Sequence, residues 1–317
     1  MTNQPKIIVV IGPTASGKSE YTVKLARKCN GEIISADSRQ VYKNLDIGTG
    51  KVLGHWTSFK IRGRGRSKTE SKVFVYKGIP HHCIDYISPK KQYAVTDFKH
   101  DAELAIADII RRGKTPIICG GTGLYVDAVL FNQVIPDVKP DFAYRKILET
   151  KTREQLFTLL KKLDPKRAQT IDSHNPRRLI RALEIIHVTG KPVPVPQAAP
   201  NMTHLTYRSN TSHEPYLLPV EIHYLNPPRA ELYKKIEKRL KEWLKRDALF
   251  KEIKKLRASG VSWKRIAEFG LEYTFATEYM RGRIDYAAMY TQALKSIQQY
   301  AKRQETWFKK YEQHTVQ

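Results

Sequence analysis

Short apolar runs alternate with amphipathic stretches in the N-terminal part of the chain. Residues 6–11, 31–36 and 115–119 are short, mainly apolar runs rich in isoleucine, a pattern typical of parallel strands buried on both faces. Residues 20–28 and 96–112 have the three- and four-residue apolar spacing of helices. Strands that alternate with helices in this way predict an α/β fold, a parallel sheet flanked by helices.

The pattern changes to helices alone after Pro136. Asn175 followed by proline would open the last of them, and Gly190 would close it. We expect an inserted, small all-helical domain over residues 136–200 that ends in a proline-rich connector. The core would then consist of residues 1–135 and 201–317. The predicted helices of the insertion are 141–150, 153–163 and 176–189.

The second part of the core begins with one strand and continues as helices. Residues 217–224 predict a strand that returns the chain to the sheet. Residues 230–258 are lysine-rich and amphipathic, which predicts one helix that ends before Gly260. A final amphipathic helix is expected from about residue 286.

The net charge of the chain indicates what kind of molecule it binds. The chain of 317 residues has 56 lysines and arginines against 31 acidic residues, a formal charge of +25. Such an excess is expected of a protein that binds nucleic acid or another polyanion, although solubility or a bias of the source would also produce it. Three cysteines without CxxC spacing indicate neither disulfides nor zinc, and no apolar run is long enough for a membrane span. We expect a cytoplasmic protein that does not bind membranes.

A phosphate-binding motif lies between the first apolar run and the first helix. It fits the P-loop pattern, in which backbone amides and a helix N-terminus surround an anion. Lys18 would reach the terminal phosphate oxygens, and the Ser19 hydroxyl would hold Mg²⁺. The motif does not identify the phosphate compound. The diphosphate- or nucleotide-binding residues are Gly12, Pro13, Thr14, Ala15, Ser16, Gly17, Lys18 and Ser19.

Two other strand ends contain candidate chemistry. Asp37 follows the second apolar run, and the carboxyl ends of strands face the ligand crevice in α/β sheets. A capping or loop carboxylate is the alternative. The third run ends in Gly120-Gly121-Thr122 instead of the Walker-B aspartate of motor ATPases, which argues against a hydrolase. Thr122 is a candidate for a phosphate or RNA contact or, alternatively, a helix cap.

Two basic segments are candidates for RNA contacts. Arg177, Arg178 and Arg181 cluster at helical spacing opposite an apolar stripe. They would form either a phosphate-reading surface or an ordinary solvated face. Residues 59–68 are basic and rich in glycine, which fits an arm that touches phosphates or the solvated tip of a hairpin.

The order of these motifs resembles the tRNA dimethylallyltransferase family over nearly the whole chain. The P-loop alone is shared with many kinases and GTPases, whereas the complete set is specific. Gly50 and Gln298 depart from the family, which commonly has alanine and arginine there. The matching segments beyond the P-loop are 34–38, 41–42, 45–49, 120–122, 175–179, 181–184, 270–273 and 301–307.

The resemblance implies an activity and a set of roles. Family members transfer a dimethylallyl group from its diphosphate to the exocyclic amine of the adenosine 3′ of the anticodon. By resemblance, the P-loop binds dimethylallyl diphosphate and Mg²⁺ instead of ATP, Asp37 is the general base, and Lys18 and Thr122 assist catalysis. The partner is the tRNA anticodon stem-loop, and the enzyme is expected to be a monomer. The implied tRNA contacts are Asp37, Ser38, Arg39, Gln40, Thr122, Arg145, Arg177, Arg178, Arg181, Gly270 and Tyr273.

Other functions compete with this one. A P-loop small-molecule kinase would use the helical insertion as an ATP lid. An RNA-binding protein with a regulatory nucleotide site would bind tRNA without modifying it. An enzyme that prenylates free adenine nucleotide would share the fold and the chemistry, but it would not need the large basic surface.

Overall fold

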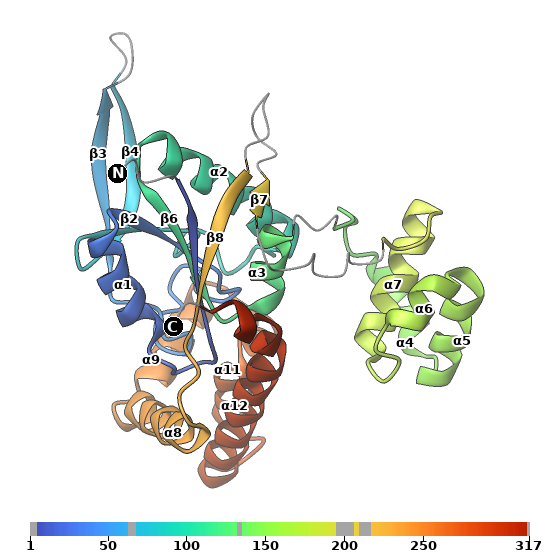
Figure 1. The fold of residues 1–317 in the computed structure, drawn as a ribbon. Coiled ribbons are helices and arrows are strands. Elements are labelled where there is room, and N and C mark those ends of the chain that lie inside the picture. The colour runs from blue at the N-terminus through green and yellow to red at the C-terminus, as the bar shows by residue number, and fades with distance from the viewer. Residues whose placement is uncertain (1–4, 63–67, 132–134, 195–205, 209–216, 316–317) are drawn as a thin grey trace. The chain divides into compact units, whose positions relative to one another are not determined.

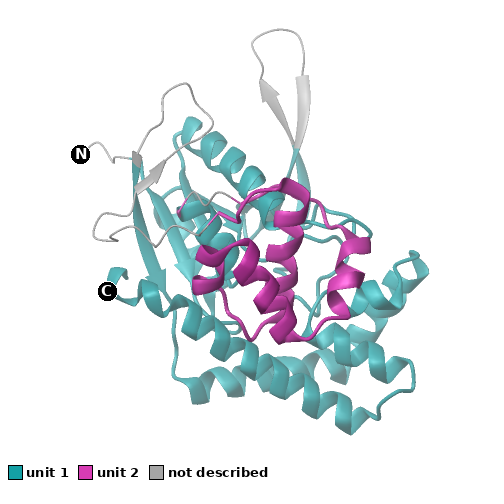
Figure 2. Ribbon diagram, turned by 90° about the vertical axis from the view of Figure 1, so that its right-hand side faces the viewer, with its two compact units in different colours: residues 1–130, 201–317 teal, residues 131–200 magenta. Residues whose placement is uncertain are grey.

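The computed structural model describes residues 5–62, 68–131, 135–194, 206–208 and 217–315, which divide into two compact units (Figure 2). One unit contains residues 1–130 and 201–317, and the other contains residues 131–200. The second unit therefore starts slightly before residue 136, where the sequence placed the insertion.

The first unit is built on one sheet with the strand order β3-β4-β5-β2-β6-β1-β8-β7 among the described residues (Figure 1). Its parallel strands are β1 (Ile7–Ile11), β2 (Gly31–Ser35), β5 (Ile79–His82), β6 (Thr115–Gly120) and β8 (Leu217–Tyr224). The antiparallel strands, at the two edges, are β3 (His55–Arg62), β4 (Lys68–Tyr76) and β7 (Thr206–Arg208). The predicted α/β class is confirmed. The antiparallel β3–β4 pair fits the hairpin that was one interpretation of residues 59–68, whereas the short edge strand β7 was not predicted.

Both faces of the central strands are covered. Every residue of β1 is buried, although successive side chains point to opposite faces. The helix α1 (Lys18–Lys28) packs against β1, β2 and β6, and α2 (Val95–Arg111) and α3 (Gly123–Leu130) also contact β6. The two segments of the basic stretch 59–68 that are described belong to the β3–β4 hairpin, while residues 63–67 lie outside the described residues.

The C-terminal part of the first unit is helical, as predicted, but one expectation is wrong. Residues 230–258 form two helices, because Asp247 adopts a left-handed conformation with φ of 52° between them. Leu244 and Leu249 are both buried, so the apolar stripe continues across the break. The helices of this part are α8 (Arg229–Lys245), α9 (Ala248–Ala258), α10 (Trp263–Ala267), α11 (Leu271–Met280) and α12 (Tyr286–Phe308), followed by the 3-10 helix η2 (Lys309–His314).

The core of these helices includes the segment that follows β2. Val41, Tyr42 and Leu45 are buried among side chains of α8, α9, α11 and α12. The chain between β2 and β3 is therefore anchored to helices that come about 200 residues later in the sequence. None of the helices in the described ranges combines the length and the hydropathy that a bilayer span needs.

The second unit has a core of its own. Its helices begin at polar caps: the side chains of Asp141, Thr152 and Asn175 each accept a hydrogen bond from a backbone amide in the first turn. Leu160 and Leu183 are completely buried in its centre. The short helix α6 was not predicted, because six residues are too few for a periodic pattern. The helices are α4 (Phe142–Glu149), α5 (Arg153–Leu163), α6 (Pro165–Thr170) and α7 (Pro176–Thr189).

Candidate active site

The glycine-rich loop between β1 and α1 has the geometry of an anion site. Gly17 precedes α1 with φ of 90°, a conformation that side chains with a Cβ rarely adopt. The first amides of a helix have no acceptor within it, so those of α1 are available to an anion bound at this loop. The Lys18 ammonium donates to the carbonyl oxygens of Gly12, at 2.8 Å, and Pro13, at 2.6 Å. Burial lowers the pKa of Lys18 to about 8.

A cavity of about 300 Å³ adjoins this loop. Gln304 of α12 fixes two of its walls, because its Oε1 accepts from the Thr14 amide at 2.8 Å and its Nε2 donates to the Gly121 carbonyl at 2.7 Å. The P-loop and the turn after β6 are thus held together by one buried side chain. The cavity is lined by Thr14, Ala15, Ser16, Gly17, Lys18, Ser19, Glu20, Thr22, Ile33, Ser35, Asp37, Gln40, Thr49, Gly50, Val52, His81, Ile84, Cys119, Gly120, Gly121, Arg239, Tyr300 and Gln304.

Asp37 lies on the wall of this cavity, at the end of β2. Its Oδ1 accepts from the amides of Arg39, at 2.9 Å, and Gln40, at 3.3 Å, which fixes the carboxylate in a tight turn. Among the described residues its Oδ2 has no hydrogen-bond partner. Gly120, at the end of the neighbouring strand β6, allows the chain at Ala36 to pass close by. A Cβ at position 120 would lie only 2.1 Å from the Ala36 carbonyl oxygen.

Thr122 lies beside this turn and lines neither of the cavities in this site. Its hydroxyl accepts a hydrogen bond from the Ser38 amide at 3.1 Å, and its own amide donates to the Ala36 carbonyl at 3.2 Å. Thr122 therefore holds the segment that contains Asp37. The catalytic role that the resemblance implied for Thr122 remains a prediction, and the structure shows a positioning contact.

A second cavity of about 290 Å³ meets the first at Asp37. Of the predicted residues, Arg39 and Gly270 line only this second cavity, whereas Asp37 lines both. The complete set of residues common to both cavities is Thr14, Asp37, Thr49, Arg239 and Tyr300. The remaining walls of the second cavity are Arg39, Gly48, Phe269, Gly270, Leu271, Glu272, Ile297 and Arg303.

Arg239 is a site residue that the sequence analysis missed. It comes from α8, and its Nη2 donates to the Thr14 hydroxyl at 2.8 Å, while its guanidinium stacks on Trp243 at 4.7 Å. Its Nε is buried and has no hydrogen-bond partner among the described residues. The guanidinium is therefore a second, incompletely paired cation at the cavity wall, in addition to Lys18. Its burial lowers its pKa. In the sequence it is one basic residue in a lysine-rich helix, and no local signal separates it from its neighbours.

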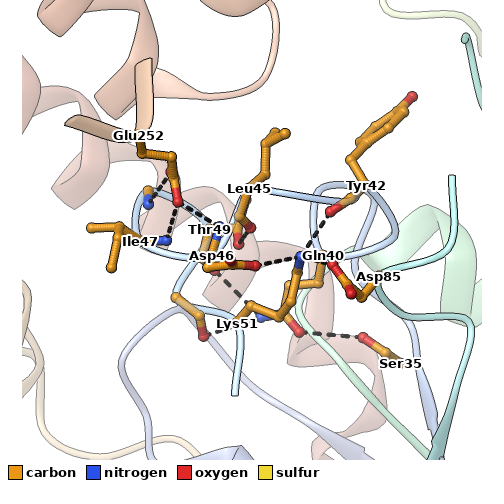
Figure 3. Close-up of polar contacts among 12 residues, drawn as sticks. Ser35, Gln40, Tyr42, Leu45, Asp46, Ile47, Thr49, Lys51, Asp85 and Glu252 are labelled. Atoms are coloured by element: carbon orange, nitrogen blue, oxygen red, sulfur yellow. Dashed lines mark hydrogen bonds and ion pairs between the residues drawn. The ribbon is translucent and has the colours of Figure 1, made fainter. Parts of the chain in front are cut away.

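A buried glutamate holds the loop of residues 46–48 in place (Figure 3). The Glu252 carboxylate accepts from three consecutive amides, those of Asp46 at 2.7 Å, Ile47 at 2.8 Å and Gly48 at 3.2 Å. The Tyr273 hydroxyl donates to the same carboxylate at 2.6 Å. This is an anion-binding loop filled by a side chain of the protein itself.

A lysine completes the support of this loop. The ammonium of Lys51, with a side chain that is only 2% exposed, donates to Asp46 Oδ1 at 2.8 Å and Asp85 Oδ1 at 2.6 Å, and to the Tyr42 carbonyl at 2.7 Å. The side-chain Nε2 of Gln40 in turn donates to the carbonyls of Thr49 and Gly50 at 3.3 and 3.4 Å. Hydrogen bonds thereby cross-link the chain between Gln40 and Lys51, as Figure 3 shows, and Gln40, Thr49 and Gly50 of this stretch line the first cavity.

The structure pairs several of the predicted RNA contacts with carboxylates inside the protein. Tyr273 is completely buried, so its side chain is not available to RNA and instead supports Glu252. In the second unit, Arg145 and Arg181 both donate to the buried Glu184, at distances of 2.5–2.8 Å. The expectation of three arginines without acidic partners is therefore wrong for Arg181, and Arg178 Nη1 also lies 3.9 Å from the Asp172 carboxylate. Arg177 and Arg178 remain exposed on α7.

The donor set at Ser19 fits magnesium only in combination with a phosphate ligand. The Ser19 side chain lines the first cavity. Among the described residues, no group of three or more histidine, cysteine, aspartate or glutamate side chains could hold a metal. Because Mg²⁺ commonly retains waters and takes substrate phosphate oxygens as ligands, a hydroxyl beside a phosphate cradle suits it.

Comparisons with known proteins identify the family. The chain matches the IPP transferase family over residues 40–311 and the isopentenyl transferase family over residues 5–58. It is 36% identical over 311 residues to a tRNA dimethylallyltransferase of Caldanaerobacter subterraneus, which covers 97% of this chain and 90% of that protein.

Solved structures agree with this match. The full-length tRNA isopentenylpyrophosphate transferase of Bacillus halodurans is 32% identical, with a TM-score of 0.61, over 96% of this chain and 87% of that one. A eukaryotic dimethylallyltransferase described as acting on tRNA is 28% identical, with a TM-score of 0.68, over 96% of this chain and 70% of that one. The resemblance noted in the motifs is confirmed, and the chain belongs to the IPP transferase family.

Proposed function

We propose that this protein transfers the dimethylallyl group of dimethylallyl diphosphate to the exocyclic amine, N6, of the adenosine 3′-adjacent to the anticodon in tRNA. The observation that carries the proposal is Asp37 on the wall common to two cavities, one of which is bordered by the phosphate-binding loop. The names of the relatives, which act on tRNA and transfer a dimethylallyl group, support the same chemistry.

The first cavity would bind the donor. The loop amides, Lys18 and Arg239 would face the diphosphate, and the negative charge that grows there as the C1–O bond breaks would be stabilised by these fixed donors. The carbon chain would lie farther along the same cavity. Two half-buried cations next to an apolar floor suit a molecule with an anionic head and a hydrocarbon tail.

The second cavity would receive the adenine after the nucleotide has been turned out of the anticodon loop. Arg39 and Arg303 on its walls would meet the surrounding phosphates. As the bond between N6 and the allylic carbon forms, N6 loses a proton, and the free Oδ2 of Asp37 is the acceptor. The products are the prenylated adenosine, inorganic diphosphate and a proton that passes from Asp37 to solvent.

Magnesium would enter with the donor diphosphate, with Ser19 Oγ as its ligand from the protein. It would supply charge neutralisation to the leaving group. ATP is not required by this reaction, so the loop serves here as a prenyl diphosphate site.

The test is Asp37→Asn, with tRNA and dimethylallyl diphosphate as substrates and mass analysis of the tRNA nucleosides as the readout. The transfer rate should fall by about 10²–10⁴, because the amide cannot accept the proton, while tRNA binding is retained. Asp137→Asn, an exposed carboxylate that lines neither cavity, is the matched control and should keep the full rate. An Asp37→Asn enzyme with an undiminished rate would remove Asp37 from the role of base.

A further inference from the structure

A third and larger cavity lies behind the end of the donor cavity. Its volume is about 790 Å³, and its walls come mainly from β4, β5 and α2. Trp56, Phe74 and Leu104 contribute apolar surface to it, and Trp56 and Leu104 are 42% and 50% exposed, so the cavity opens to solvent. None of the P-loop residues lines it.

Among the described residues, only two line both this cavity and the donor cavity. They are His81 on β5 and Ile84 just after it, with exposures of 6% and 2%. The His81 ring is held in place by three contacts: Nδ1 lies 2.9 Å from the Ile79 carbonyl oxygen, and the ring meets Phe74 and Tyr76 edge to face. Burial lowers the pKa of His81 to about 4, so the imidazole is uncharged at neutral pH.

The sheet register shows which end of the donor cavity these residues close. Ile33 is paired with His81, and Ser35 is paired with Cys119, so these side chains share one face of the sheet. This face forms the floor of the donor cavity, which extends from the P-loop after β1 across β6 and β2 to β5. Three strand spacings of about 4.8 Å put β5 about 14 Å from β1. His81 is thus at the end remote from the phosphate-binding loop, where the floor is apolar.

We infer that His81, backed by Ile84, is the wall that limits the donor to a five-carbon allylic chain, and that the cavity behind it would accept the next isoprene unit if the wall were removed. This inference rests on the proposed function, because it assumes that the hydrocarbon points away from the P-loop. The wild-type enzyme would exclude the ten-carbon geranyl diphosphate by contact with these two side chains. His81 and Ile84 are in this sense specificity-determining residues.

The experiment compares dimethylallyl diphosphate with geranyl diphosphate on wild type and on His81→Ala, with kcat/KM for each donor and the mass of the modified adenosine as readouts. The ratio of geranyl to dimethylallyl transfer should rise by more than about tenfold in the variant, since hydrocarbon pockets discriminate by 10–200-fold per methylene. Ile84→Ala should shift the ratio in the same direction. Leu104→Ala, on the outer wall of the third cavity only, should retain wild-type selectivity.

Two results would overturn the inference. One is a folded His81→Ala or Ile84→Ala enzyme that transfers dimethylallyl groups and still rejects geranyl diphosphate as wild type does. The other needs no variant: a wild-type enzyme that uses both donors equally well has no such wall. Failure of wild type to modify tRNA with dimethylallyl diphosphate would instead contradict the proposed function, so the two failures are distinguishable.

Discussion

A buried glutamate organises each of the two units, but the two glutamates bind different partners. In the first unit Glu252 accepts from the backbone amides of residues 46–48 and fixes a loop of the candidate site. In the second unit Glu184 accepts from Arg145, Arg181 and the Asp141 amide, and it joins helices. Hydrogen bonds from these donors hold the pKa of Glu184 below its usual range although burial raises it.

The difference shows how ambiguous a basic residue is in a sequence. Arg145 and Arg181 look like RNA contacts and are used for internal support, whereas Arg239 looks like one more helix surface cation and lines both site cavities. The Nε of Arg239 has no hydrogen-bond partner among the described residues, which leaves this guanidinium available to a ligand. Four predictions follow from this contrast.

The largest effect is expected for Glu184→Gln, which should destabilise the second unit by about 3 kcal/mol. This is the low end for breaking a buried ion pair, because the two arginine side chains are 30% and 35% exposed and keep part of their hydration. All four tryptophans lie in the first unit, so urea unfolding followed by circular dichroism should shift while tryptophan fluorescence should not. Glu154→Gln, at an exposed pair, is the control. Equal shifts in both signals would contradict a local role.

Glu252→Gln should destabilise the first unit less than Glu184→Gln destabilises the second, and it should also lower kcat. The amide can no longer accept from all of its donors, and an unmet buried amide costs about 1–3 kcal/mol. The loop supports Gln40 and the cavity wall, so its displacement should raise the activation free energy by about 1.4 kcal/mol. This lowers kcat about tenfold. The affinity for tRNA should change little. Glu242→Gln, an exposed position on α8, should behave as wild type. Loss of tRNA affinity without loss of kcat would contradict the positioning role.

The next prediction concerns pH, because Lys18 in the first unit loses its charge at alkaline pH and the arginines of the second unit do not. The pKa of Lys18 is lowered to about 8, so its ammonium is lost as the pH rises above that value, and donor kcat/KM should fall about tenfold per pH unit. The arginines of the second unit stay charged, so tRNA binding should remain flat over the same range. Lys18→Met should be slow at every pH and lack the alkaline decline. An unchanged decline in that variant would assign it to another group.

The smallest effect is expected at the exposed arginines of α7. Replacing Arg177 and Arg178 together by alanine should reduce the salt slope of tRNA binding by about one to two units, because each phosphate contact contributes up to about one. The protein should keep its stability, in contrast to an Arg181→Ala variant, which breaks the contact with Glu184. Binding measured between low and moderate salt gives the slope. An unchanged salt slope would mean that these arginines lie on a solvated face of α7 and do not contact tRNA phosphates.

The sequence by itself determined the features that depend on neighbouring residues. The P-loop, the buried strands and the capped helices of the second unit follow from local periodicity, glycine conformation and capping side chains, all of which act within a few residues. The placement of Asp37 at a strand end is of the same kind, because parallel strands bring their carboxyl ends to one edge.

Only the tertiary structure decided which residues support that edge. Gln304 binds an amide 290 positions away, and Glu252 binds one 206 positions away. Contacts of this range leave no periodic trace in the sequence, since their energy depends on where the fold brings two segments together. For the same reason the burial of Tyr273, the pairing of Arg181 and the shared wall at His81 and Ile84 became visible only once helices, loops and strands were packed.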